Sequence, residues 1–243
     1  MEQFSLWGTV VNVLTVLAGS SIGMLIKHFM GRSKSQGMEQ LSDTVLKGLG
    51  LCVMVIGISG AVAGGNTLVM ILSVAIGAVI GHLLRLDHGI TVLGEKVETL
   101  TRARFGNVAQ GFVSASLLFC VGSMTVVGAL NSGLIGDHSM LYTKSLLDFV
   151  SSTVFAASMG IGVMFAAAFV LVFQGSITLL AVWVAPLLNT EVITCMTCVG
   201  SVLIIGLALN MLGITKLKIM NYLPAIFLPI GLIPLANWLA TLI

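Results

Sequence analysis

The chain has 243 residues, of which 57% are hydrophobic and 8% are charged, with a formal net charge of +2 and a mean hydropathy of +1.11. Soluble domains carry about 25% charged residues, so this composition excludes an ordinary soluble globular domain. The sequence predicts an all-α, polytopic integral membrane protein in which residues 1–243 form a single transmembrane domain.

Eight apolar runs predict eight transmembrane helices, each near the roughly 20 residues that cross a bilayer. The runs cover residues 6–26, 47–64, 67–84, 109–130, 147–165, 168–188, 193–213 and 220–241. The first run has no basic leader before it and no clear cleavage site, so it is interpreted as a retained span. The boundary near Phe165 and Ala166 has no strong helix breaker. If residues 147–188 form one segment plus a loop, the count is seven.

Ten of the eleven Lys and Arg residues lie in three polar gaps, at 27–47, 85–107 and 214–219. Eight spans place all three gaps on one side of the membrane, which the positive-inside rule makes cytoplasmic, and both termini are then predicted outside. The gap 85–107 also has apolar residues at roughly helical spacing. This pattern indicates an amphipathic surface helix or, alternatively, a loop with a few aliphatic residues. The aromatic anchors Trp7, Trp183 and Trp238 lie near the predicted outer interfaces.

Two short internal matches indicate an inverted-topology repeat, an architecture used by many secondary transporters. Residues 112–114 and 149–151 both read Phe-Val-Ser, and residues 53–60 resemble residues 202–209. With eight spans, both pairs run in opposite directions across the membrane. Chance is the alternative explanation, because membrane helices draw on few residue types.

Three pairs of glycines spaced four residues apart predict close packing of helices. They are Gly19 with Gly23, Gly60 with Gly64, and Gly77 with Gly81. Such faces serve contacts within one chain or a homo-oligomer, and they do not identify a substrate.

Glycine, hydroxyl and amide residues concentrate from the middle of the run 109–130 into the run 147–165. Irregular backbone at membrane depth is tolerated only where it is buried in protein or lines a wet cavity. The stretch therefore predicts a broken helix that holds an ion or a solute. The candidate ligands in it are Ser123, Thr125, Asn131, Lys144, Asp148, Ser151 and Ser152.

Lys144 and Asp148 are spaced i, i+4 and are expected on one helix face. Asp148 is predicted in the first turn or two of its span, where the helix dipole favours a carboxylate. In a functional interpretation Asp148 is a ligand or gate residue and Lys144 is its counter-charge. In a structural interpretation the two form an interfacial ion pair that anchors the helix.

Asn12 and Gln174 complete the candidate site, because each is an amide at membrane depth beside Gly and Ser or Thr residues. Gln174 and Gly175 are expected to interrupt their span, whereas Asn210 is expected only to bridge helices. No carboxylate is predicted near the centre of a span, so a mid-membrane proton relay is not expected. No nucleotide loop, metal-ligand set or catalytic constellation is recognised, so neither an enzyme nor a cofactor is predicted.

The chain resembles the YdfK/YqgA family of bacterial inner-membrane proteins over essentially its whole length, in the segments GTVVNVLTVLAGSSIG, VVGALNSGLIGDHSMLYTKSLLD and TKLKIMNYLPAIF. The resemblance implies a location in the bacterial cytoplasmic membrane and a sodium channel or pump as a candidate activity, with no established mechanism. The positions that match the family pattern are Asn12, Asn131, Gly133, Asp137, Lys144, Ser145, Asp148 and Asn221.

Two functions are consistent with these features. The first is a membrane transporter or channel for a small solute or a monovalent cation such as Na⁺, which hydroxyls, amides and carbonyls would coordinate. The second is a membrane scaffold or regulatory subunit without transport activity, whose glycine-rich faces bind a partner. The lipid bilayer is the expected surrounding in both, and nucleic acid is not an expected partner.

Overall fold

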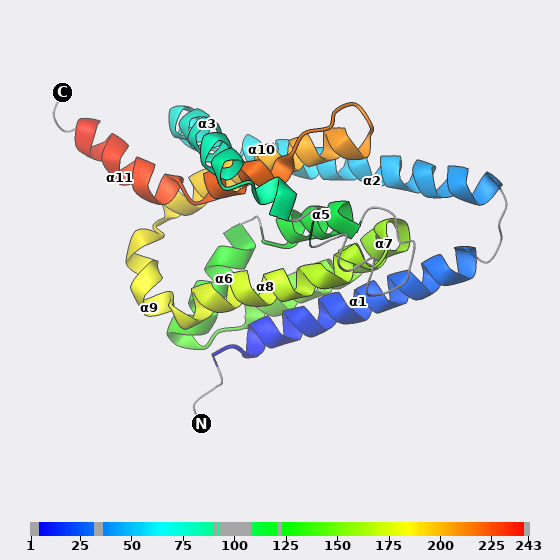
Figure 1. The fold of residues 1–243 in the computed structure, drawn as a ribbon. Coiled ribbons are helices and arrows are strands. Elements are labelled where there is room, and N and C mark those ends of the chain that lie inside the picture. The colour runs from blue at the N-terminus through cyan, green and yellow to red at the C-terminus, as the bar shows by residue number, and fades with distance from the viewer. Residues whose placement is uncertain (1–4, 32–35, 90–91, 93–107, 121–122, 241–243) are drawn as a thin grey trace.

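The computed structural model describes residues 5–31, 36–89, 92, 108–120 and 123–240, and within these residues its regular structure is helical (Figure 1). The elements are α1 (Trp7–Gly31), α2 (Gln36–Ala61), α3 (Thr67–Leu83), α5 (Val108–Cys120), α6 (Ser123–Ile135), α7 (Ser139–Met159), α8 (Gly162–Leu179), α9 (Ala181–Val184), the 3-10 segment η1 (Ala185–Leu187), α10 (Thr190–Met211), the 3-10 segment η2 (Ile219–Ile226) and α11 (Pro229–Ala240). The all-α prediction is confirmed for the described part. The expected surface helix falls mainly on residues 90–91 and 93–107, which lie outside it.

Four helices are long and apolar enough to cross a membrane, and the number rises to six if each of two bent helix pairs counts as one span. The four are Trp7–Phe29, Asp43–Ala61, Gly162–Leu179 and Thr190–Met211. α3 is apolar but has only 17 residues, and α7 has 21 residues but carries Lys144, Asp148 and several hydroxyls. The polytopic helical character therefore holds, while the count of eight spans stays a prediction.

α1 and α7 lie side by side and run in the same direction (Figure 1). Gly19 packs on the backbone of Phe149, and Gly23 packs on the backbone of Thr153 one turn further along both helices. At the far end of the contact, Lys27 Nζ donates a hydrogen bond to the Ser158 carbonyl oxygen at 3.1 Å. This ammonium satisfies a carbonyl of the last turn of α7, which has no partner within its own helix.

α2 and α10 form a second close pair and run antiparallel. Gly50 lies against Met211, and Gly60 lies against Ser201. The matched segments 53–60 and 202–209 thus lie on two antiparallel helices that pack on each other. The inverted repeat itself stays a prediction.

The helix bundle has two ends, one marked by tryptophans and the other by basic residues. The tryptophan end, at the left of Figure 1, contains the start of α1, all of α9 and the end of α11, which carry Trp7, Trp183 and Trp238. These side chains are exposed. The basic end, opposite, contains Lys27, Lys47, Arg85, Lys216 and Lys218.

Local capping fixes two helix starts at the tryptophan end. Asn66 accepts from Leu68 N at 3.1 Å before α3, and Asn189 accepts from Val192 N at 2.9 Å before α10.

The predicted boundary between the fifth and sixth apolar runs is wrong. α7 already begins at Ser139, and the turn into α8 falls at Gly160, whose φ is 81°, instead of near Phe165 and Ala166. Glycine adopts positive φ without a Cβ penalty, so it ends α7 where an apolar run alone gives no signal. Gln174 and Gly175 do not interrupt α8, which continues to Leu179.

Two apolar runs are broken helices. α5 and α6 meet at 61° across residues 121–122, which lie outside the described residues, in the stretch where a break is predicted. η2 and α11 meet at 48°, a break that the sequence analysis missed. The missed signals are Pro224 and Pro229, because proline removes a backbone donor and clashes with the preceding helical turn.

The glycine pairs pack against other helices of the same chain, with one exception. Gly77 and Gly81 of α3 face η2, where Gly81 meets the Asn221 carbonyl. Gly64, however, lies beyond the end of α2 with a φ of 97° and has no atom within 4 Å of the position of a Cβ. Its predicted role in helix packing is wrong, because the helix ends before it.

We expect Gly81→Ala to destabilise the fold, since the added Cβ collides with the Asn221 backbone and overpacking costs about 1–3 kcal/mol. Thermal unfolding in detergent measures this as a melting temperature lowered by about 2–4 °C per kcal/mol. The matched control is Gly48→Ala in α2, where a Cβ meets no atom within 4 Å and helix propensity improves by up to about 1 kcal/mol. Equal melting temperatures for the two variants would contradict the close α3–η2 contact.

Candidate functional site: a buried polar cluster between α1, α7 and α8

Three neighbouring helices each turn two polar side chains toward a common interior. The pairs are spaced three or four residues apart, so each pair shares one face of its helix. The six residues, here called the polar cluster, are Thr9, Asn12, Lys144, Asp148, Gln174 and Thr178, and none is more than 6% exposed. Buried polar groups on this scale require partners.

The amides and hydroxyls of the polar cluster form a chain of hydrogen bonds. Asn12 Nδ2 donates to Gln174 Oε1 at 3.1 Å, and Gln174 Nε2 donates to Thr9 Oγ1 at 3.1 Å. The hydroxyls of Thr9 and Thr178 are 3.4 Å apart. Because these bonds join α1 to α8 across more than 160 residues of sequence, they fix how the two helices face each other.

Lys144 Nζ donates to Asp148 Oδ2, and both side chains are less than 10% exposed. The Asn12 side chain also faces the Asp148 carboxylate, so the ion pair lies beside the hydrogen-bonded chain. On the other side, Lys144 Nζ lies 6.0 Å from the centroid of the Phe119 ring in α5, within the range of a cation–π contact. In the described part of the chain, Lys144 and Asp148 are the only Lys, Arg, Asp or Glu side chains that are buried.

Asp148 lies near the middle of its helix, which overturns one expectation. It is not in the first turn or two, because α7 begins at Ser139, about 13–14 Å away at 1.5 Å per residue. The cause of the error is that the polar residues before Leu146 hide the first two turns of α7 from a search for apolar runs. The absence of a carboxylate near the centre of a membrane span stays a prediction.

One atom of the polar cluster has no partner among the described residues. Asn12 Oδ1 is fully buried and accepts no hydrogen bond, which costs about 1–3 kcal/mol. Ser20 in α1 and Ser114 and Ser116 in α5 also have buried hydroxyls without a partner. The unmet Asn12 oxygen beside the Asp148 carboxylate forms an environment that favours a cation or ordered water.

The structure brings together four of the predicted site residues: Asn12, Lys144, Asp148 and Gln174. The remaining predicted residues form local hydrogen bonds or lie away from the polar cluster. Thr125 donates to the Phe119 carbonyl at 3.0 Å across the α5–α6 break, Ser152 donates to the Phe149 carbonyl at 3.0 Å, and the Asn131 carbonyl accepts from Asp137 N at 3.3 Å. Ser151 is half-buried on α7, and the side chain of Ser123 lies outside the described part.

Sequence reasoning missed Thr9 and Thr178. The signal was available, because Thr9 precedes Asn12 by three residues and Thr178 follows Gln174 by four, so each shares a helix face with a predicted amide. A further buried contact near the start of α7 was also missed: Ser132 Oγ lies 2.8 Å from His138 Nδ1 and donates to the Ser5 carbonyl at 2.6 Å.

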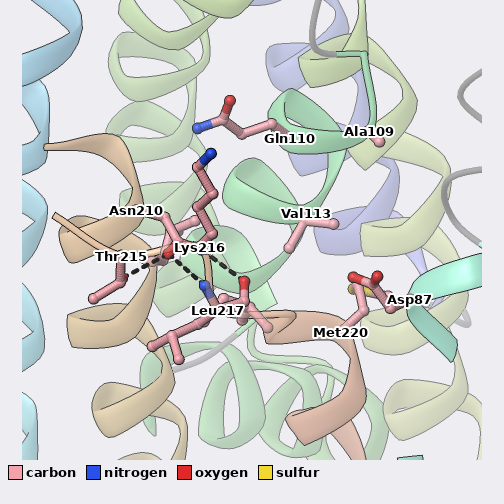
Figure 2. Close-up of a pocket in the computed structure, with 11 residues that line it drawn as sticks. Asp87, Ala109, Gln110, Val113, Asn210, Thr215, Lys216, Leu217 and Met220 are labelled. Atoms are coloured by element: carbon pink, nitrogen blue, oxygen red, sulfur yellow. Dashed lines mark hydrogen bonds between the residues drawn. The ribbon is translucent and has the colours of Figure 1, made fainter. Parts of the chain in front are cut away.

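A separate pocket of about 450 Å³ opens at the basic end between α5, α10 and the loop before η2 (Figure 2). In Figure 2 the ends of the Lys216 and Gln110 side chains point toward one another, and Asp87 lies across the pocket. Asn210 Oδ1 accepts from Thr215 Oγ1 at 2.7 Å and from Leu217 N at 2.8 Å. Asn210 therefore shapes this loop, whereas the sequence analysis predicted that it bridges helices. No residue of the predicted site lines the pocket.

These observations define a helical membrane protein in which, among the described residues, the buried Lys144 and Asp148 gather with the amides of Asn12 and Gln174 in one interior cluster. The chain belongs to the family described as "Protein of unknown function (DUF554)", whose model matches residues 7–233.

Two relatives agree with this assignment. The chain is 31% identical over 228 residues to "Uncharacterized membrane protein YdfK" of Bacillus subtilis (strain 168), covering 92% of this chain and 94% of the relative. It is 30% identical over 230 residues to "Uncharacterized protein YqgA" of Escherichia coli (strain K12), covering 93% of this chain and 95% of the relative. The resemblance to the YdfK/YqgA family is thus confirmed. No solved structure matched the chain.

Removing one member of the buried ion pair is expected to destabilise the protein by about 3–5 kcal/mol, whereas replacing both by apolar residues is expected to be near neutral. Lys144→Met tests the first case and the double variant Lys144→Met with Asp148→Leu tests the second, by thermal unfolding in detergent. The exposed pair Lys47–Asp43 is the control, where Lys47→Met should change stability by no more than about 0.5 kcal/mol. A double variant as unstable as the single one would show that the pair is kept for stability.

Proposed function

We propose that this protein transports a monovalent cation, with Na⁺ as the first candidate, or a small polar solute, and that the polar cluster is its binding site. The observation that carries the proposal is the buried Lys144–Asp148 pair with its amide and hydroxyl neighbours. A buried ion pair contributes little net stability, and ionisable residues inside membrane proteins commonly serve substrate and ion pathways. The cluster is thus better explained by binding than by folding.

The proposed membrane arrangement has eight spans: α1, α2, α3, the bent pair α5–α6, α7, α8, α10 and the bent pair η2–α11. The antiparallel contact of α2 with α10 and the parallel contact of α1 with α7 agree with a chain that crosses at each of these elements. All basic gaps then lie at one end, which the positive-inside rule makes cytoplasmic. The tryptophan end and both termini would face outward from the bacterial cytoplasmic membrane.

Oxygen atoms dominate the proposed site. The Asp148 carboxylate, the unpartnered Asn12 Oδ1 and the Gln174 Oε1 are the candidate ligands, and hard cations prefer carboxylate and carbonyl oxygen. These oxygens would replace the water molecules that a cation loses when it enters the site. The same set of groups also binds a small polar solute by hydrogen bonds.

Polar groups lead from the proposed site toward both ends. Toward the tryptophan end, Thr9 and Thr178 continue the hydrogen-bonded chain. Toward the basic end, α5 carries the buried hydroxyls of Ser114 and Ser116 between Phe119 and Gln110, and Gln110 lines the pocket of Figure 2. We propose these as the outer and inner approaches, with Phe119 and its neighbours separating them.

The competing function is a scaffold or regulatory subunit without transport. Its main sequence argument is the glycine-rich faces, but Gly19, Gly23, Gly60, Gly77 and Gly81 contact helices of the same chain. These faces are therefore not free surfaces for a partner. The transport experiment below distinguishes the two functions.

The proposed orientation predicts the labelling of single cysteines by a membrane-impermeant maleimide added to intact cells. A cysteine at Leu187, which is exposed at the tryptophan end, should react, and a cysteine at Lys216, which is exposed at the basic end, should react only after the membrane is permeabilised. A Cys52→Ala background removes the exposed native cysteine, and the other three are buried. Labelling of the Lys216→Cys variant in intact cells would overturn the orientation.

The transport proposal predicts ²²Na⁺ uptake into proteoliposomes that contain the purified protein, and an uptake rate at least about tenfold lower for Asp148→Asn. The estimate follows because one hydrogen bond to a charged group contributes about 1.5–3 kcal/mol and each 1.4 kcal/mol corresponds to a factor of about ten. The matched control is Asp43→Asn, which alters an exposed i, i+4 pair with Lys47 and should leave uptake unchanged.

Two results would count against transport at this site. Uptake by a folded Asp148→Asn variant at the wild-type rate would show that transport does not require the Asp148 carboxylate. Absence of uptake of Na⁺ or of other monovalent cations by the wild-type protein, together with a stoichiometric co-purifying partner, would favour the scaffold. If Asp148→Asn does not fold, the double variant Lys144→Gln with Asp148→Asn removes the unpaired buried ammonium and decides the first point.

A further inference from the structure

The pocket of Figure 2 is large enough to hold a small organic molecule. Its volume of about 450 Å³ lies within the range of about 300–1,000 Å³ that is typical of ligand sites. Part of its wall is apolar and is formed by side chains that are at most 9% exposed, those of Val113, Leu207, Ile219 and Met220. Amide and charged groups also line it, so the pocket offers a molecule both apolar contact and polar partners.

The loop that carries Lys216 is held on both sides of this residue. Asn210 Oδ1 accepts from Thr215 Oγ1 at 2.7 Å and from Leu217 N at 2.8 Å. Asn210 Nδ2 donates to the Leu217 carbonyl at 2.7 Å. One side chain near the end of α10 thus fixes both neighbours of Lys216 in the chain. A loop that is already ordered loses less entropy when a ligand binds to it.

Two donor groups meet in the pocket without an acceptor between them. Figure 2 shows the nitrogen end of the Gln110 amide and the ammonium of Lys216 turned toward one another. Neither nitrogen can accept a hydrogen bond from the other. Among the described residues, neither side chain has a hydrogen-bond or ion-pair partner. A carboxylate or phosphate oxygen placed between them would accept from both in charge-assisted hydrogen bonds.

The opposite charge lies across the pocket. Asp87 is on the far wall (Figure 2), and its backbone N donates to Asn221 Oδ1 at 3.0 Å, which ties it to η2. The Asp87 carboxylate pairs with Lys218 Nζ at 3.8 Å, but the Lys218 side chain is 71% exposed. Exposed ion pairs contribute little free energy, so a ligand ammonium can replace Lys218 at this carboxylate at little cost.

We propose that this pocket binds a small zwitterion, a molecule with an ammonium group and a carboxylate or phosphate group. The anionic group binds between Lys216 and Gln110, and the ammonium group binds Asp87. A molecule with only one of these charges faces repulsion from the like charge of the pocket and leaves the other charge unused. Amino acids and the ethanolamine phosphate headgroup of a lipid share this chemistry. The pocket also lies on the proposed inner approach, but binding of the zwitterion does not depend on cation transport.

Isothermal titration calorimetry with the purified protein in detergent tests the site. The probes are the neutral L-amino acids and O-phosphoethanolamine, and we expect saturable binding of at least one of them. The matched controls for leucine are isocaproate, which lacks the ammonium, and isoamylamine, which lacks the carboxylate. Those for O-phosphoethanolamine are ethyl phosphate and ethylamine. Each control should bind at least about tenfold more weakly than its zwitterion, because it loses a hydrogen bond to a charged group.

Variants test whether binding occurs in this pocket. Lys216→Gln and Asp87→Asn should each weaken binding at least about tenfold, and Lys47→Gln, which alters an exposed pair in α2, should leave it unchanged. Lys218→Gln removes the competing ammonium from Asp87, so binding should be equal or tighter. A general attraction of anions to the basic end predicts weaker binding for this variant. The melting temperature of each variant without ligand shows that it is folded.

Three results would overturn the proposal. They are saturable binding of none of the zwitterions, a control acid that binds as tightly as its zwitterion, and unchanged affinity in folded Lys216→Gln and Asp87→Asn. Binding of amino acids alone supports a soluble ligand, and binding of O-phosphoethanolamine alone supports a lipid headgroup. None of these measurements uses transport, so failure of this proposal is distinguishable from failure of the proposed cation transport.

Discussion

α1 and α7 approach closely because Gly19 and Gly23 leave bare backbone where any larger residue would collide with Phe149 and Thr153. Membrane helices gain little from burying apolar surface against each other, so small residues that permit close contact decide which helices pair. This contact brings Asn12 over the ion pair of α7, and the same face of α1 then meets Gln174 of α8. The polar cluster is thus a consequence of where two glycines fall in α1.

The polar cluster combines groups that stabilise one another with groups that do not. The bonds from Asn12 to Gln174 and from Gln174 to Thr9 satisfy buried amides, which would otherwise cost the full price of desolvation. The buried ion pair and the unmet Asn12 Oδ1 bring no such gain. A bundle selected only for stability would fill this volume with aliphatic side chains, so stability alone does not explain the arrangement.

Much of the candidate site could be predicted from the sequence, but the spatial arrangement of its residues could not. Asn12, Lys144, Asp148 and Gln174 were each identifiable, because polar residues within apolar runs are few. Thr125 and Ser152 were grouped with them through proximity in sequence, although their hydroxyls bond to carbonyls of their own neighbourhood. The place of Asp148 along its helix was misjudged because hydropathy hides a helix start that is polar, and α7 begins seven residues before Leu146.

The sequence by itself determined that the chain belongs in a membrane, that it is helical and that its basic residues gather in three gaps. These follow from hydropathy and charge, which each segment carries independently of its neighbours. Only the tertiary structure decided that Gly160 ends α7, that the last apolar run bends between η2 and α11, and that Asn12 meets Gln174 and Asp148. Such meetings depend on how helices distant in sequence rotate and pack, and that is set by the fit of backbone surfaces, which no single segment encodes.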